Sequence, residues 1–149
     1  MEERYASDGS EERIVRRKAS GVIRGYGDLD VYQNSYKAML TIFKHILPLL
    51  PKEERFDLAD QLRRSCKAIP RLIAEGHSKR HQARGFQKYI DDAHAESNET
   101  IVSLTQVKDL YASTANSAAL IKLIDLYDKI SRQLFNLSHS WRSYSKYRR

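Results

Sequence analysis

The sequence has few residues that bend or end regular secondary structure, with six glycines and three prolines among 149 residues. An all-β protein needs many tight turns, and those turns usually contain glycine or proline. The single cysteine, Cys66, cannot form a disulfide within the chain, and its apolar neighbours are typical of a buried thiol in a reducing compartment. Length and composition therefore favour one helical domain with a single core.

Long apolar runs are also missing from the sequence. The most apolar stretch, residues 38–50, is interrupted by Lys44 and His45, whereas a membrane-spanning helix needs about 20 apolar residues. Acidic and polar residues open the chain, and no apolar signal region follows them. We therefore expect a cytoplasmic protein that makes no contact with a membrane.

Four amphipathic helices are predicted from apolar residues that recur at steps of three and four. An aspartate, Asp28 or Asp30, suits the N-cap of the first helix, and Pro51 suits the first position of the second. Gly76 is expected to end the second helix in a left-handed cap, and Pro70 to kink it. The predicted helices span residues 28–47, 51–76 and about 82–111, with a fourth that begins at 116 or 117.

The inward faces of these helices follow from the same periodicity. The first helix is expected to bury Tyr32, Tyr36, Met39, Leu40, Phe43, Ile46 and Leu50. The second is expected to bury Phe56, Ala59, Leu62, Cys66, Ile69 and Ile73. The third is expected to bury Phe86, Tyr89, Ile90, Ala93, Ser97, Ile101, Leu104, Val107 and Tyr111. The fourth is expected to bury Leu120, Leu123, Ile124, Tyr127, Ile130, Leu134, Leu137, Trp141 and Tyr144.

The predicted fold is all-α, an antiparallel up-down-up-down four-helix bundle over residues 27–149. Residues 1–26 are expected to form a flexible charged tail, because their one apolar pair, Ile14-Val15, offers too little surface to offset the entropy of ordering. Two interpretations of the tail stay open: a solvated tail, or a segment that becomes ordered when it binds a partner.

Positive charge is concentrated in two segments of a chain whose net charge is +7. Residues 76–88 and 131–149 contain four and five cations and no acid, and an antiparallel bundle brings both segments to one end. Phosphate backbones select such a surface, and aromatic residues near the C-terminus, Trp141, Tyr144 and Tyr147, are suited to stack on unpaired bases. The candidate nucleic-acid-binding residues are Arg63, Arg64, Lys67, Arg71, Lys79, Arg80, Arg84, Lys88, Arg142, Lys146, Arg148 and Arg149.

The same charge pattern has an alternative interpretation without a polyanionic partner. Cations near helix C-termini stabilise any bundle, and lysine or arginine beside tyrosine also occurs at the rim of oligomer interfaces. Four cations at the start of the third helix oppose its dipole, so this argument does not account for them. Both interpretations remain open at this point.

Metal and catalytic sites are not expected. Asp91 and His94 have the spacing of a di-metal bundle site, but no second pair of this kind exists in the sequence. A buried Cys66 is not activated as a nucleophile. For Glu75 we expect an ion pair with Arg71 or Lys79, and for Asn98 a hydrogen bond across the bundle or between subunits. No catalytic residue, cofactor or metal is therefore predicted.

Two motifs at the centre of the second helix carry a family resemblance. The strings QLRR at 61–64 and IPRLIAEG at 69–76, with DLDVYQ at 28–33, PKEE at 51–54 and NE at 98–99, resemble the four-helix-bundle family found in intervening sequences of bacterial 23S ribosomal RNA genes. The resemblance covers about residues 27–140 and implies a closed homo-oligomer, a pentameric ring. More distantly, the chain is similar to accessory proteins of diversity-generating retroelements, which implies a reverse transcriptase as a candidate partner.

The functional hypothesis combines the charge pattern with this resemblance. We expect a non-catalytic basic bundle that binds RNA or DNA as an accessory subunit of a larger nucleic-acid machine. The alternative is an oligomeric scaffold for other proteins that does not bind nucleic acid.

Overall fold

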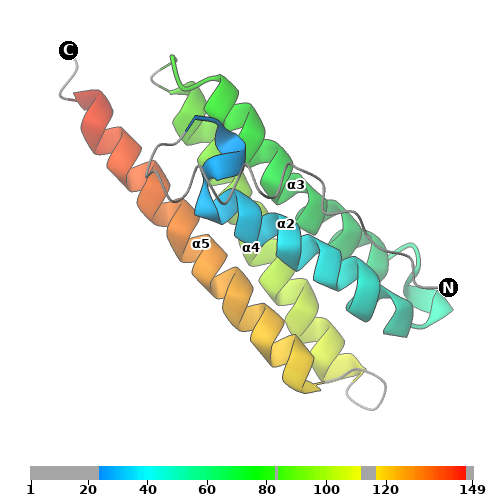
Figure 1. The fold of residues 1–149 in the computed structure, drawn as a ribbon. Helices are drawn as coiled ribbons and strands as arrows, with labels where there is room; N and C mark the ends of the chain where they lie inside the picture. The colour runs from blue at the N-terminus through cyan, green and yellow to red at the C-terminus, as the bar shows by residue number, and fades with distance from the viewer. Residues whose placement is uncertain (1–23, 83, 112–116, 147–149) are drawn as a thin grey trace, which may run out of the picture.

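The computed structural model describes residues 24–82, 84–111 and 117–146, with side chains up to Trp141. Four long helices, α2 (Asp30–Thr41), α3 (Leu58–Ser78), α4 (Gly85–Leu110) and α5 (Ser117–Lys146), form an antiparallel bundle, and the described residues contain no strand (Figure 1). Each helix packs against the next in the chain, and α5 also packs against α2. The predicted fold class is therefore confirmed. The predicted tail lies outside the described residues except for residues 24–26.

Short turns join the helices at the two ends of the bundle. A 3-10 turn, η1 (Tyr26–Asp28), precedes α2, and a π-helical turn, η2 (Ile42–Ile46), continues it. Two more 3-10 turns, η3 (Leu47–Leu49) and η4 (Lys52–Glu54), lead into α3. No helix among the described residues combines the length and the apolar character that a membrane span needs.

The cores of α3, α4 and α5 follow the predicted faces closely. Ala59, Leu62, Cys66, Ile69 and Ile73 of α3 are buried, as are Ile90, Leu104 and Val107 of α4. The prediction for Phe56 was wrong, because this residue precedes α3 and is 85% exposed. In α5 the buried apolar residues are Leu120, Leu123, Tyr127, Ile130 and Leu134. Each large apolar side chain removed from water in this way contributes about 1.5–3 kcal/mol, so these three faces hold the bundle together.

The predicted face of the first helix was right in part: Ile46 is buried, and Tyr32, Met39 and Leu50 pack against the core, but the other three predicted residues are exposed. Val31, Ser35, Ala38, Ile42 and Ile46 are buried. By contrast, Tyr36, Leu40 and Phe43 are 44%, 40% and 36% exposed. The small side chains of Ser35 and Ala38 let α2 lie close to the neighbouring helices, whereas the larger side chains of Tyr36, Leu40 and Phe43 remain on the outside of the bundle. The result is an apolar surface on α2 that the bundle itself does not cover.

Three predicted helix ends also differ from the structure. Helix α3 begins at Leu58 rather than at Pro51, because Pro51 has an extended backbone and the Glu54 carboxylate accepts the hydrogen bond of the Leu58 amide at 3.1 Å. Neither aspartate caps α2, whose N-cap position is Leu29. Asp28 instead accepts hydrogen bonds from the amides of residues 24 and 25, at 2.8 and 3.3 Å, and so stabilises η1.

Gly76 does not end the second helix. It is buried inside α3, which continues to Ser78, and a Cβ atom at this position would lie 3.0 Å from the Cβ of Tyr89. The glycine therefore allows α3 and α4 to approach each other, and no left-handed cap is formed. Pro70 is likewise buried within α3, and the helix continues through it without interruption.

Hydroxyl groups line the contacts of α4 with its two neighbours. The Thr100 hydroxyl donates to that of Ser65 at 2.9 Å, between α4 and α3. Between α4 and α5, the hydroxyls of Ser97 and Ser131 lie 2.7 Å apart, and Ser131 also donates to Oδ1 of Asn98 at 3.0 Å. The hydrogen bond that the sequence predicted for Asn98 across the bundle is thus confirmed.

Candidate nucleic-acid interface

The end of α3, the start of α4, the start of α2 and the end of α5 meet at one end of the bundle (Figure 1). Two ring contacts fix this arrangement: Phe86 of α4 lies 4.5 Å from Trp141 of α5, and Tyr26 of η1 lies 6.4 Å from His77 of α3. Four cations between Lys79 and Lys88 lie at the end of α3, in the turn that follows it and in the first turns of α4, and we name Lys79, Arg80, Arg84 and Lys88 the basic pole.

Two lysines of the basic pole converge on one tyrosine. Lys79 donates a hydrogen bond to the Tyr89 hydroxyl at 2.8 Å, and the ammonium groups of Lys79 and Lys88 lie 4.7 and 5.0 Å from the Tyr89 ring. The hydrogen bond to Tyr89 raises the pKa of Lys79, and a hydrogen bond to Asp92 at 3.0 Å raises the pKa of Lys88. Both lysines therefore stay charged at neutral pH.

Arg80 is oriented by the last turn of α3. Its Nη1 donates to the backbone oxygen of His77 at 2.8 Å and lies 3.3 Å from Nδ1 of the same residue. Burial lowers the pKa of His77, and the neighbouring Arg80 lowers it further, so the imidazole is neutral at pH 7. Arg84 is exposed and occupies the N-cap position of α4, where it makes no side-chain cap.

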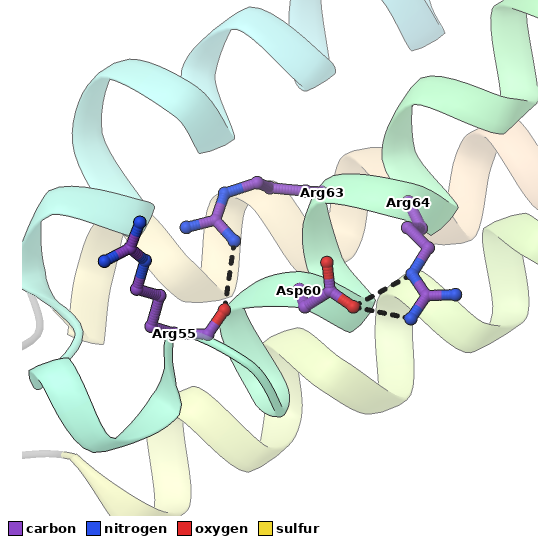
Figure 2. Close-up of polar contacts among 4 residues, drawn as sticks. All are labelled: Arg55, Asp60, Arg63 and Arg64. Carbon is purple, nitrogen blue, oxygen red and sulfur yellow. Dashed lines mark hydrogen bonds and ion pairs between the residues drawn. The ribbon is translucent and has the colours of Figure 1, made fainter.

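Four other predicted residues lie elsewhere on α3. Arg63 and Lys79 are sixteen residues apart, which is about 24 Å along a helix. Arg64 pairs with Asp60 through bonds of 2.9 and 2.6 Å, and Arg63 donates to the backbone oxygen of Arg55 at 3.3 Å (Figure 2). The structure therefore does not bring the predicted residues into one patch.

Lys67 and Arg71 belong to this second group. The Lys67 ammonium lies 6.0 Å from the ring of Phe43, beside the exposed surface of α2. Arg71 is exposed and has no ion pair or hydrogen bond among the residues that the structure describes. We name Arg63, Arg64, Lys67 and Arg71 the mid-helix cations.

The C-terminal candidates are only partly described. The backbone of α5 carries Arg142 and Lys146 toward the basic pole, whereas Arg148 and Arg149 lie outside the described residues (Figure 1). The side chains of Tyr144 and Tyr147 are not described either. Trp141 is half-buried and packs on Phe86 and the core, in agreement with its predicted place on the inner face of the fourth helix, and its stacking on bases stays a prediction.

The acidic and thiol groups of the described ranges are dispersed over the bundle. No group of three or more His, Cys, Asp or Glu side chains lies there at metal-binding distance. Asp91 accepts a hydrogen bond from Ser138 at 2.5 Å. Burial raises the pKa of Cys66 to about 12, so the thiol is protonated at neutral pH. The ion pair predicted for Glu75 was wrong: it forms none with Arg71 or Lys79.

A family model described as 23S rRNA-intervening sequence protein matches residues 27–136. The chain belongs to this family. No curated protein and no solved structure matches the chain. The matched residues of this family member include the whole of α2, α3 and α4, and so all four cations of the basic pole.

Sequence reasoning missed two aromatic residues of the basic pole in this family member. Tyr89 was assigned to the core, yet it is half-buried and contacts both lysines. Tyr26 was assigned to the tail, yet it packs on Tyr32 at 5.0 Å and on His77. The available signal was its closeness to the predicted start of the first helix, where apolar residues before the N-cap often pack on the first turns.

Proposed function

We propose that this chain is a non-catalytic nucleic-acid-binding protein, an accessory subunit of a larger machine such as a reverse transcriptase or a ribosomal RNA complex. The observation that carries the proposal is the basic pole. Among its four cations, only Lys88 forms an ion pair with an acid in the described part of the chain. Lys79, Arg80 and Arg84 therefore keep their charge available for a phosphate backbone.

The position of these cations supports an external anion as their partner. The amide groups at the start of a helix carry a partial positive charge, so nearby cations lower the stability of the helix. Arg84 and Lys88 lie in or beside the first turn of α4, which spans 26 residues. A bound phosphate would offset this repulsion, and Tyr26 and Tyr89 are near enough to stack on unpaired bases.

Assembly into a ring would multiply the effect of each basic pole. A closed ring of identical subunits uses two different faces of each subunit. One such face is the exposed apolar surface of α2, with Lys67 beside it. The other lies on the α4–α5 side of the bundle, and it contains exposed Val102 and Phe135.

The charges of these two faces are mixed. Lys67 of α3 borders the α2 face, whereas on the α4–α5 side Asp128 pairs with Arg132 and Asp91 accepts a hydrogen bond from Ser138. The family resemblance favours a pentamer, in which five basic poles would form one rim and weak phosphate contacts would add through effective concentration.

The function is tested by comparing two variants that lose equal charge. The first replaces Lys79, Arg80 and Arg84 by serine, and the second replaces Arg63, Arg64 and Lys67 by serine. Binding of mixed-sequence RNA and DNA is measured against salt concentration. The first variant should bind weakly and lose up to about 2.7 from the slope of log affinity against log salt, at about 0.9 for each duplex phosphate contact.

The second variant should keep most of its affinity, because the mid-helix cations lie away from the pole. Dichroism checks that both variants remain folded. If both bind as the parent chain does, nucleic-acid binding by the basic pole is refuted and the oligomeric scaffold becomes the better hypothesis. A wild-type chain that scatters light as a monomer at micromolar concentration would refute the ring.

A further inference from the structure

A row of aromatic rings leads from the basic pole along the outside of α2. His77 of α3 lies 6.4 Å from Tyr26 of η1, measured between ring centroids. Tyr32 of α2 in turn lies 5.0 Å from Tyr26 and 6.0 Å from Tyr36. Tyr26 and Tyr36 are 42% and 44% exposed, whereas Tyr32 between them is half-buried and packs against the core. We name Tyr26, Tyr32 and Tyr36 the tyrosine row, in which an anchored inner ring holds two outer rings that face solvent.

The tyrosine row begins beside a guanidinium group of the basic pole. In the described part of the chain, the contacts of Arg80 are made by Nη1, with the ring and the backbone oxygen of His77. Arginine carries donors on three nitrogen atoms, so Nε and Nη2 of this exposed side chain remain available for phosphate oxygens. A phosphate bound at Arg80 would therefore lie next to the imidazole ring that Tyr26 contacts.

The acids of this region are bonded elsewhere or turned away from the tyrosine row. Asp28 is buried and accepts hydrogen bonds from two backbone amides of the preceding turn. Glu75 faces the lysines of the basic pole, on the α4 side of α3. At about 100° per residue, Asp30 lies about 160° around α2 from Tyr32. Arg24, by contrast, is exposed just before η1, so the charges that border the row in the described residues are positive.

We infer that the tyrosine row stacks the bases of an unpaired strand, so that the chain prefers single-stranded RNA or DNA to a duplex. This inference rests on the nucleic-acid binding proposed above. Bases in a duplex stack on one another, whereas an unpaired strand can turn its base faces toward protein rings. A contact between subunits at Leu40 and Phe43, beside Lys67, lies further from the pole and does not require Tyr26.

The test compares two labelled strands that carry the same number of phosphates, an oligothymidine of about 12 nucleotides and an abasic strand of equal length. Fluorescence anisotropy reports their binding to the full chain. The parent should bind oligothymidine about tenfold more tightly than the abasic strand, since stacking on aromatic rings contributes at least this factor. The double variant Tyr26→Leu, Tyr36→Leu should bring the ratio close to one.

Two further measurements separate stacking from charge. The double variant should bind the abasic strand with the affinity and the salt dependence of the parent, because neutral tyrosine releases no counterions. Annealing oligothymidine to its complement should remove the difference between the parent and the double variant. Tyr36→Leu alone changes an exposed helix position and should lower the ratio several-fold, which keeps the test valid if dichroism shows that Tyr26→Leu perturbs the fold.

Matched controls locate the effect in the rings. Tyr26→Phe and Tyr36→Phe keep both rings and should bind as the parent does. Phe56→Leu removes a more exposed ring at the opposite end of the bundle and should change nothing.

The outcomes distinguish this inference from the function on which it rests. If the parent binds the two strands equally, or if the double leucine variant keeps the parent's ratio, stacking by the tyrosine row is overturned while binding by the basic pole stands. If the serine variant of the basic pole binds oligothymidine as the parent does, the proposed function fails instead. Loss of self-association in the leucine variants, with an unchanged ratio, would show that a second copy of the chain covers the row.

Discussion

Tyr127 provides a sharp test of the core. Its side chain is fully buried, and its hydroxyl has no hydrogen-bond partner among the described residues. Folding removes this hydroxyl from water without replacing its hydrogen bond, which costs about 1–3 kcal/mol. Tyr127→Phe keeps the ring and deletes the oxygen, and the lost dispersion contacts amount to only a few tenths of a kcal/mol. The substitution should therefore stabilise the chain by about 1 kcal/mol or more.

The measurement is urea unfolding followed by far-ultraviolet dichroism, at one fixed protein concentration so that assembly does not change the apparent stability. The matched control is Tyr111→Phe, which deletes a hydroxyl that does donate, to Glu54. That substitution should lower stability, so the same chemical change is expected to act in opposite directions at the two positions. A loss of about 1 kcal/mol or more in Tyr127→Phe would refute the reasoning, because the hydroxyl would then have a favourable partner.

Three further substitutions test packing and titration. Leu134→Ala should destabilise the chain by about 2–5 kcal/mol in the same assay, because Leu134 is fully buried in the seam of α5, and a cost below about 0.5 kcal/mol would contradict this placement. Gly76→Val should cost about 1–3 kcal/mol by forcing α3 away from Tyr89, whereas an unchanged midpoint would show that the helices do not approach closely there. Burial raises the pKa of Cys66 to about 12, so the folded chain holds the thiol proton more tightly than the unfolded chain. This contribution is fully present below about pH 8.5, the ordinary pKa of a thiol, and is lost as pH rises toward 12. Cys66→Ala should therefore lose less stability than the parent between pH 9 and about 11, and parallel pH profiles would contradict the prediction.

The faces of the longer helices could be predicted from the sequence, and that of α2 could not. Leu62, Ile90 and Leu134 stand in long periodic patterns in which the large apolar residues are also the buried ones. In α2 the contact with the neighbouring helices is made by Ser35 and Ala38. These two residues are suited to the contact because they are small, not because they are strongly hydrophobic. A periodicity argument gives such residues little weight, and it therefore assigned the larger exposed rings to the core.

The basic pole was predictable from topology, but its details depend on three-dimensional contacts. Charge counts and an antiparallel order were sufficient to place Lys79 and Arg84 at one end. Two lysines contact Tyr89, and Trp141 packs on Phe86. Each of these contacts is made between residues of different turns or different helices. No local pattern in the sequence encodes such contacts.

The length of α4 has a consequence for how the molecule would approach a polyanion. Its 26 residues extend over about 39 Å, and the segment that contains Glu53 and Asp57 lies at the far end, where the Tyr111 hydroxyl donates to Glu54. Mobile ions screen charges beyond about 8 Å at physiological ionic strength. The distant carboxylates would therefore not weaken a contact made by the basic pole. At longer range in dilute buffer, the uneven charge would exert a torque that turns the bundle end-on before collision, so the orienting effect should fade as salt is added.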